Sequence, residues 1–258
     1  MYLDSHCHLN DEKLIENVDE IVSSSFKAGV TTLLVVGYDI DSSLKAIDIA
    51  SRHNGVYAAI GFHPENLEGI SDEELNKIKE LAKNSKKVIA IGEIGLDYHW
   101  YKEERDRENQ KEWFIKQLRL ADELNLPVSI HARDAIQDTY DILKKYTPKV
   151  KGVLHCYSGS TEMLKEFEKI GFYFGFDGPI TYKNSIVPKE CVKAVSIDRI
   201  LSETDSPYLP PVPFRGKTNY PEYIPYIVRQ MSELREVSLD FLCKKIQDNF
   251  FKLFHVKP

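Results

Sequence analysis

The sequence has 258 residues, of which 42% are hydrophobic and 29% are charged, as is ordinary for a globular protein. Its formal net charge of −6 argues against a protein that holds nucleic acid through a broad basic surface. No apolar run approaches the roughly 20 residues of a membrane span, and the N-terminus has no signal-peptide pattern. We therefore expect a cytoplasmic protein that makes no contact with membranes.

Short runs of β-branched residues alternate with longer amphipathic segments along the whole chain. The predicted strands are Tyr2–Asp4, Thr31–Val36, Val56–Ile60, Val88–Ile91, Val128–Ile130, Gly152–Leu154, Phe172–Phe176 and Arg199–Leu201. The predicted helices are Asp11–Ala28, Asp41–His53, Asp72–Lys83, Arg105–Leu124, Ala135–Lys145, Thr161–Ile170, Tyr223–Leu234 and Leu239–Phe254.

Eight strands, each followed by a helix, predict an α/β fold of the (β/α)₈ TIM barrel class, with one domain over residues 1–258. An open doubly wound sheet gives the same alternation but usually has fewer strands. Neither of the common glycine-rich nucleotide-binding loops follows a predicted strand. The barrel is therefore the favoured architecture.

Five of the eight histidines fall at predicted strand ends, where such barrels place their chemistry. His6 and His8 follow the first strand and, because side chains alternate along a strand, they face the same way. The other strand-end candidates are His63, Glu93, His131, Arg133, His155, Glu203 and Asp205. We interpret His53 and His255 as surface residues and leave His99 unassigned.

Imidazole and carboxylate groups without thiolates suit zinc, manganese, cobalt, nickel or magnesium in sites that stay open to water. Four histidines and two acids are too many for one catalytic ion, and they suit two ions that share a bridging carboxylate. The residues thus predict metal-assisted hydrolysis. The four scattered cysteines indicate reduced thiols, and we expect Cys7 and Cys156 to face away from the site.

The chain resembles the TatD family of metal-dependent deoxyribonucleases, within the wider amidohydrolase-like metal barrels. The matching stretches are YLDSHCHLN, GFHP, GEIGLDYH, PVSIHARDA, VLHCYSG and LSETDSPYLPP, and the tail DNFFKLF also fits. The resemblance implies that one ion is held by His6, His8 and Asp205, the other by His131 and His155, with Glu93 between them. It also implies that His63 and Arg133 contact substrate phosphate and that Asp205 hydrogen-bonds the nucleophilic water.

Other residues leave alternatives open. Glu203 is a metal ligand, a partner that orients a ligand, or a structural carboxylate, and we favour the second. Arg215 either reaches the substrate or is a solvated loop charge. Tyr98 is a further candidate for substrate discrimination. Arg133 either binds substrate phosphate or forms a surface salt bridge with Asp134 or a neighbour.

We therefore predict a hydrolase that uses two divalent ions (Mg, Mn or Zn), with Asp205, Glu93, His63 and Arg133 as catalytic residues. The expected partner is DNA, single-stranded or at a 3′ end, cleaved in the 3′ to 5′ direction by a metal-bound hydroxide. An alternative is the hydrolysis of a carbonyl substrate, either a small amide or ester or the ester of aminoacyl-tRNA. A third possibility is a metal-stabilised scaffold or binding protein.

Overall fold

The computed structural model describes residues 1–146, 149 and 151–257, and its described residues form eight parallel strands in the order β1 to β8. The strands are β1 (Tyr2–Cys7), β2 (Val30–Val36), β3 (Val56–Ile60), β4 (Val88–Asp97), β5 (Val128–Arg133), β6 (Gly152–Leu154), β7 (Tyr173–Phe176) and β8 (Ile200–Ser202). The helices are α1 (Val18–Lys27), α2 (Ile40–Arg52), α3 (Asp72–Asn84), α4 (Glu104–Leu124), α5 (Ile136–Tyr146), α6 (Thr161–Lys169), α7 (Ile186–Ala194), α8 (Ile224–Arg235) and α9 (Leu239–Phe254). Residues 147, 148, 150 and 258 of the predicted domain lie outside the described residues.

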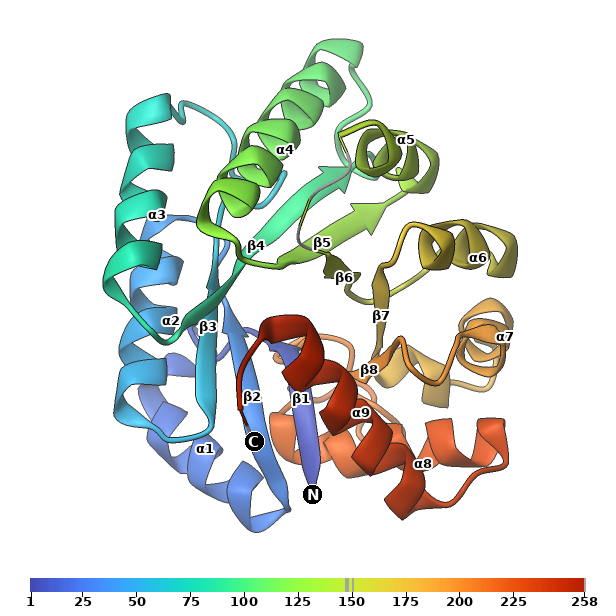
Figure 1. Ribbon diagram of the computed structural model, residues 1–258. Helices are drawn as coiled ribbons and strands as arrows, with labels where there is room; N and C mark the ends of the chain where they lie inside the picture. The colour runs from blue at the N-terminus through green and yellow to red at the C-terminus, as the bar shows by residue number, and fades with distance from the viewer. Residues whose placement is uncertain (147–148, 150, 258) are drawn as a thin grey trace.

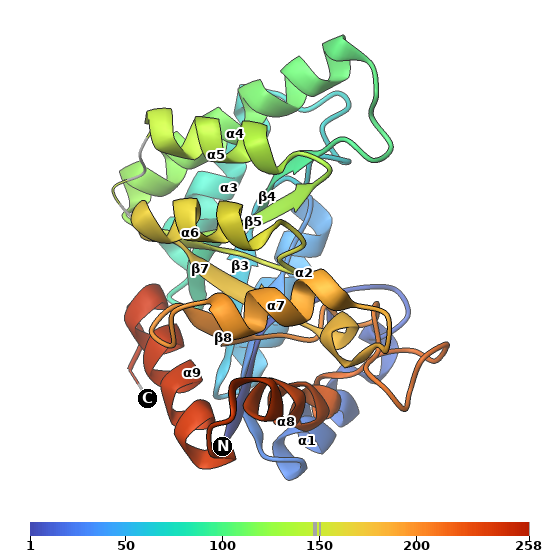
Figure 2. The same ribbon diagram turned by 90° about the vertical axis from the view of Figure 1, so that its right-hand side faces the viewer.

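The strands curve round a central axis and the helices surround them, which confirms the predicted (β/α)₈ barrel (Figure 1). All ten residues of β4 are buried, because helices cover one face of the sheet and the barrel interior fills the other. Near the N-terminus, α8 and α9 both contact β1 (Figure 2). Among the described segments, no helix has the length and apolar character needed to cross a membrane.

The barrel closes where β8 meets β1, through hydrogen bonds that involve side chains. The Ser202 hydroxyl donates to the carbonyl of Leu3 at 2.9 Å, and the Ser5 hydroxyl donates to the carbonyl of Ser202 at 3.1 Å. Just beyond β8, the backbone N–H of Asp205 donates to the carbonyl of His6 at 2.9 Å. This closure brings residues from the two ends of the sequence side by side.

Four strands, β1, β4, β5 and β8, extend past their predicted ends, and in the first three of them candidate residues lie within the strand and not after it. His6 lies in β1, Glu93 in β4, and both His131 and Arg133 in β5. The prediction ended this strand at Ile91, just before Gly92. The glycines in fact let β4 approach β5: a Cβ atom at Gly95, where φ is +146°, would lie 2.0 Å from the His131 carbonyl oxygen.

Two helix predictions were also wrong. The first predicted helix begins only at Val18, after a 3₁₀ turn over Ile15–Asn17. The sequence analysis missed α7, because Pro188 interrupts the pattern of a nine-residue segment. Pro188 lies in the first turn of α7, where the missing N–H has no intrahelical partner to lose.

Candidate metal centre

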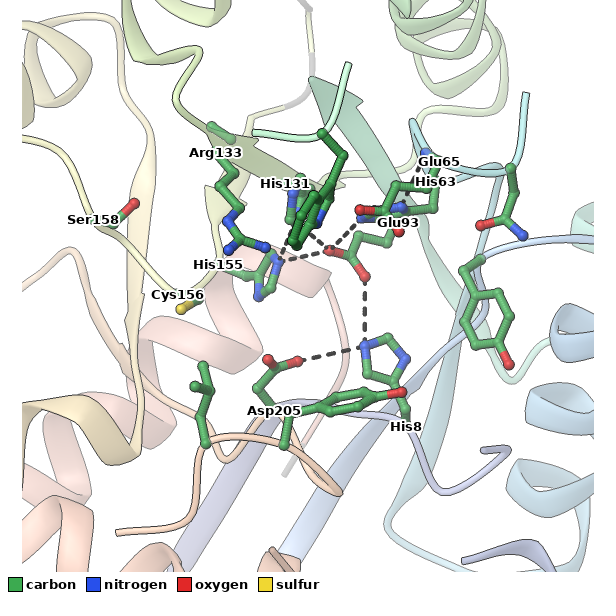
Figure 3. A pocket seen from close by; sticks show the side chains of 16 residues that line it. His8, His63, Glu65, Glu93, His131, Arg133, His155, Cys156, Ser158 and Asp205 are labelled. Carbon is green, nitrogen blue, oxygen red and sulfur yellow. Dashed lines mark hydrogen bonds and ion pairs between the residues drawn. The ribbon is translucent and has the colours of Figure 1, made fainter. Parts of the chain in front are cut away.

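A cavity of about 760 Å³ opens at the carboxyl ends of the strands. It is lined by seven of the predicted site residues, namely His8, His63, Glu93, His131, Arg133, His155 and Asp205. Figure 3 shows these side chains converging on the Glu93 carboxylate from different strands and loops. His6 is completely buried, and its ring stacks on that of His155 with centroids 3.9 Å apart.

The two oxygens of Glu93 face two separate groups of histidines. Oε2 lies 3.5 Å from Nε2 of both His6 and His8, which form the His6–His8 pair. Oε1 lies 3.0 Å from His131 Nδ1 and 2.7 Å from His155 Nε2, which form the His131–His155 pair. A carboxylate with one oxygen toward each pair has the geometry of a bridging metal ligand.

Asp205 and His63 complete the two groups. The Asp205 Oδ1 atom lies 3.5 Å from His8 Nε2 and 3.8 Å from His6 Nε2, on the side of the His6–His8 pair. His63 Nε2 lies 3.6 Å from Glu93 Oε1, on the side of the His131–His155 pair. The cavity thus has nitrogen and oxygen donors on both sides of Glu93.

Partners on the outer ring nitrogens fix which nitrogen of each ring faces Glu93. The Nδ1–H of His8 donates to the carbonyl of Val36 at 2.9 Å, so the Nε2 lone pair points inward. His131 Nε2 lies 2.9 Å from Asp97 Oδ2, which leaves Nδ1 for the centre. His6 Nδ1 lies 3.2 Å from the Ser129 hydroxyl. The sequence analysis missed Asp97 and Ser129, although Asp97 shares a strand face with Glu93, four residues earlier.

Burial and neighbouring charges act against each other on the titratable groups. Burial alone would raise the pKa of Glu93, yet the surrounding histidines hold it well below its usual value. Burial lowers the pKa of His155, but the carboxylates of Glu93 and Glu203 outweigh burial and raise it well above its usual value. Burial lowers the pKa of His63 to about 3, so this imidazole is neutral. The centre therefore holds an anionic carboxylate among histidine nitrogens.

The donor set fits divalent cations. Ligand atoms lie within 4.8 Å of one another in three overlapping groups: His6, His8 and Glu93; His6, His155 and Asp205; and His63, Glu93 and His131. Imidazole nitrogens with carboxylate oxygens are the ligands that Zn²⁺, Mn²⁺ and related ions accept in open catalytic sites. All six predicted metal ligands are close enough together to act at this centre.

Glu203 lies behind His155 and outside the cavity lining. Its side chain is fully buried, and Oε1 accepts a hydrogen bond from the backbone N–H of Cys156 and lies 3.6 Å from His155 Nδ1. A Cβ atom at residue 175 would lie 1.9 Å from Glu203 Oε2, so Gly175 makes room for the carboxylate. Glu203 thus contacts His155 and not the cavity, and its role as a partner that orients a ligand stays a prediction.

The structure does not bring two predicted substrate-binding residues to the cavity lining. Tyr98 is buried and its hydroxyl donates to Asp138 Oδ2 at 2.8 Å. The exposed Arg215 holds its guanidinium over the ring of Tyr182, with 4.3 Å between Cζ and the ring centroid. Both side chains are engaged elsewhere because local partners, which the sequence pattern does not reveal, hold them.

Cys156 lines the cavity, so the expectation that it faces away was wrong. Burial raises the pKa of its thiol well above the usual value, which disfavours the nucleophilic thiolate. Cys7 does turn away, and its thiol donates to the carbonyl of Leu34 at 3.4 Å. Sequence reasoning also missed the aromatic residues of the lining, Tyr38, Trp100 and Tyr208, although an aromatic run follows β4 in DYHWY.

A (β/α)₈ barrel with this histidine and carboxylate centre belongs to the class of metal-dependent hydrolases, and comparisons with known proteins agree. The sequence model of the family described as TatD related DNase matches residues 3–255. The chain is 42% identical over 257 residues to the metal-dependent hydrolase YabD of Bacillus subtilis, covering 99% of this chain and 100% of that one. It is 36% identical to the metal-dependent hydrolase YcfH of Escherichia coli K12, covering 98% and 96%. The chain therefore belongs to the TatD family.

Solved structures show the same relationship. The crystal structure of YjjV, a TatD homologue of Escherichia coli K12, superposes with a TM-score of 0.93 at 29% identity and covers 99% of this chain and 98% of that one. A phosphotriesterase homology protein of Escherichia coli, complexed with phosphate in its active site, superposes with a TM-score of 0.69 at 16% identity, covering 98% of each chain. The latter likeness concerns the fold alone.

Proposed function

We propose that this TatD-family hydrolase is a DNA phosphodiesterase that removes nucleotides from the 3′ end of single strands with two divalent ions (Mg, Mn or Zn). The observation that carries the proposal is the Glu93 carboxylate, with one oxygen toward the His6–His8 pair and the other toward the His131–His155 pair. When bound, such ions lower the pKa of water and stabilise the attacking and leaving oxygens of a displacement.

Asp205 and His63 then act on opposite sides of the scissile phosphate. The Asp205 carboxylate, held on the side of the His6–His8 pair, orients the attacking water and accepts its proton. The backbone N–H of Glu65 donates to His63 Nδ1 at 3.2 Å, so a neutral His63 carries its proton on Nε2. The Nε2–H of His63 donates to a phosphoryl oxygen, which gains negative charge as the water oxygen bonds to phosphorus. The bond from phosphorus to the 3′ oxygen of the preceding nucleotide breaks, and that oxygen takes up a proton as it leaves.

The charge of the cavity lining favours the end of a DNA strand, and not a long duplex, as the substrate. Of the described residues that line the cavity, Arg133 alone is a lysine or arginine. Its guanidinium presents paired donors to one phosphate, and Figure 3 shows the side chain reaching from β5 toward His155. One cation and a cavity of about 760 Å³ suit a few nucleotides at a chain end, whereas a duplex needs phosphate contacts along a groove.

The test is a time course with a 5′-labelled single-stranded oligonucleotide and protein whose metal content is known from elemental analysis. We expect a ladder that shortens from the 3′ end with Mg²⁺, Mn²⁺ or Zn²⁺, and no cleavage with chelator or in His131→Ala. His255→Asn is the matched control, because His255 is exposed at the end of α9 with φ 54°, a conformation that asparagine tolerates.

Two results contradict the proposal in different ways. Release of the 5′ label as a mononucleotide shows the opposite direction of cleavage. No cleavage by metal-loaded protein refutes DNA as the substrate and directs the next assay to carbonyl substrates, with aminoacyl-tRNA first, because the same ions polarise a carbonyl oxygen.

A further inference from the structure

Trp100 is a large aromatic side chain that the fold leaves exposed at the mouth of the cavity. It lies between β4 and α4, lines the cavity, and is 67% exposed. Trp113, the other tryptophan of the chain, is packed in the core at 6% exposure. Packing explains Trp113, but it does not explain an indole facing solvent beside a polar metal centre.

The neighbours of Trp100 connect it to the candidate substrate. The Arg133 guanidinium lies over the indole, with its Cζ 5.8 Å from the Trp100 ring centroid, and both residues line the cavity. The His99 ring meets Trp100 edge-on, with centroids 4.5 Å apart. Within the described part of the chain, the indole N–H has no hydrogen-bond partner. Trp100 is thus held by one ring contact and one cation and is otherwise open to a ligand.

We infer that Trp100 stacks on the base of the nucleotide whose phosphate Arg133 binds, so that the two residues form one nucleotide subsite. This inference rests on the proposed function. A phosphate and its own base are joined through one sugar, so adjacent cationic and aromatic groups match the two ends of a single nucleotide. Stacking on an aromatic ring tolerates any base, and it requires a base that is free of a duplex stack. The subsite therefore selects single-stranded ends of any sequence.

The kinetic test compares Trp100→Ala and Trp100→Phe with Phe241→Ala, which removes an aromatic ring of 45% exposure on α9, away from the cavity. We expect Trp100→Ala to raise KM for a single-stranded oligonucleotide about tenfold, as loss of one base stack predicts. Trp100→Phe should recover most of the loss, and Phe241→Ala should match the wild type. The metal content of all variants should be equal.

Oligonucleotides with an abasic residue at the last or the next-to-last position separate stacking from a structural role. At one of these positions the abasic residue should raise KM of the wild type about tenfold, as Trp100→Ala does with the intact oligonucleotide. For Trp100→Ala the same abasic residue should cause no further rise in KM. If Trp100→Ala weakens normal and abasic substrates equally, or weakens neither, the inference is wrong while the proposed nuclease stands.

Fluorescence tests the inference without cleavage, because Trp100 is the exposed indole of the two. Titration with a single-stranded oligonucleotide should quench the wild-type emission, and the quenching should be lost in Trp100→Phe and with the abasic oligonucleotide. Absence of cleavage would refute the proposed function, but the titration would still show whether Trp100 stacks on a base. Absence of quenching by intact oligonucleotide refutes the stacking.

Discussion

The two histidine pairs around Glu93 have the same ligand chemistry but are built differently. His6 lies in β1 and His8 directly follows its last residue; their side chains are 0% and 7% exposed, and neutral groups contact their outer nitrogens. His131 lies in β5 and His155 directly follows β6, the strand that pairs with β5. Each of these histidines has a carboxylate near its outer nitrogen. The geometry of the His6–His8 pair depends on the alternation of side chains along a strand. The geometry of the His131–His155 pair depends on the register of two strands and on buried carboxylates.

The difference has a chemical consequence. A carboxylate on the outer nitrogen makes an imidazole more basic and a stronger ligand than a carbonyl or hydroxyl does. The His131 ring is also 17% exposed and reaches into the cavity, whereas the His6 ring is fully buried. We therefore expect the two sides of the centre to respond unequally when their outer partners are changed.

Replacing Glu93 by Gln should have the largest effect, because it removes the charge that both pairs share. The amide keeps the shape of the side chain but is a poor bridging ligand. We expect the rate to fall by a factor of about 10³ or more and the bound metal to fall from about two ions per chain to one or fewer. Elemental analysis with kinetics measures both, and full metal content with near-normal activity would refute the bridging role.

Asp97→Asn and Ser129→Ala should separate the two pairs, with a smaller effect than the change at Glu93. Asp97 is the anionic partner of His131, and its loss should weaken metal affinity about 10- to 100-fold. Ser129 is the neutral partner of His6, and its loss should weaken affinity about 2- to 10-fold. Competition with a chelator measures both, and equal losses would show that the charge of the outer partner is unimportant.

Tyr98→Phe should have the smallest effect on activity, within about twofold, because the hydroxyl points away from the cavity. It removes the hydrogen bond to Asp138, which keeps Lys111 Nζ at 2.9 Å as a partner. The free energy of unfolding should fall by about 1 kcal/mol. Denaturant unfolding measures the stability and the oligonucleotide assay measures the activity. A large loss of activity at unchanged stability would show that Tyr98 contacts the substrate.

Sequence patterns were informative where local periodicity determines the structure. The HCH stretch predicts that His6 and His8 share a face, because a strand alternates whatever its neighbours are. Strand-end placement also selected six candidate ligands, which the structure brings close together, and their role as ligands stays a prediction. The alternation of elements predicted the barrel, which the structure confirms. The resemblance to a known family added the assignment of ligands to ions.

Other features depend on contacts between distant segments and were missed for that reason. The close approach of β4 to β5 at Gly95 is visible only when both strands are present, so Glu93 was placed after the strand. The burial of Tyr98 against Asp138 and the position of Arg215 over Tyr182 follow from side-chain partners that lie far apart in sequence. A pattern read along one chain carries no signal for such pairs.

The seam between β8 and β1 also sets an order of events during synthesis. His6 and His8 leave the ribosome before Asp205, which follows roughly ten to forty seconds later at about 5–20 residues per second. Glu93 is made well before that, but until Asp205 emerges the His6–His8 pair lacks the carboxylate that lies across the seam. Because the Asp205 N–H docks on the His6 carbonyl across that seam, the last quarter of the chain completes the centre that the first residues begin.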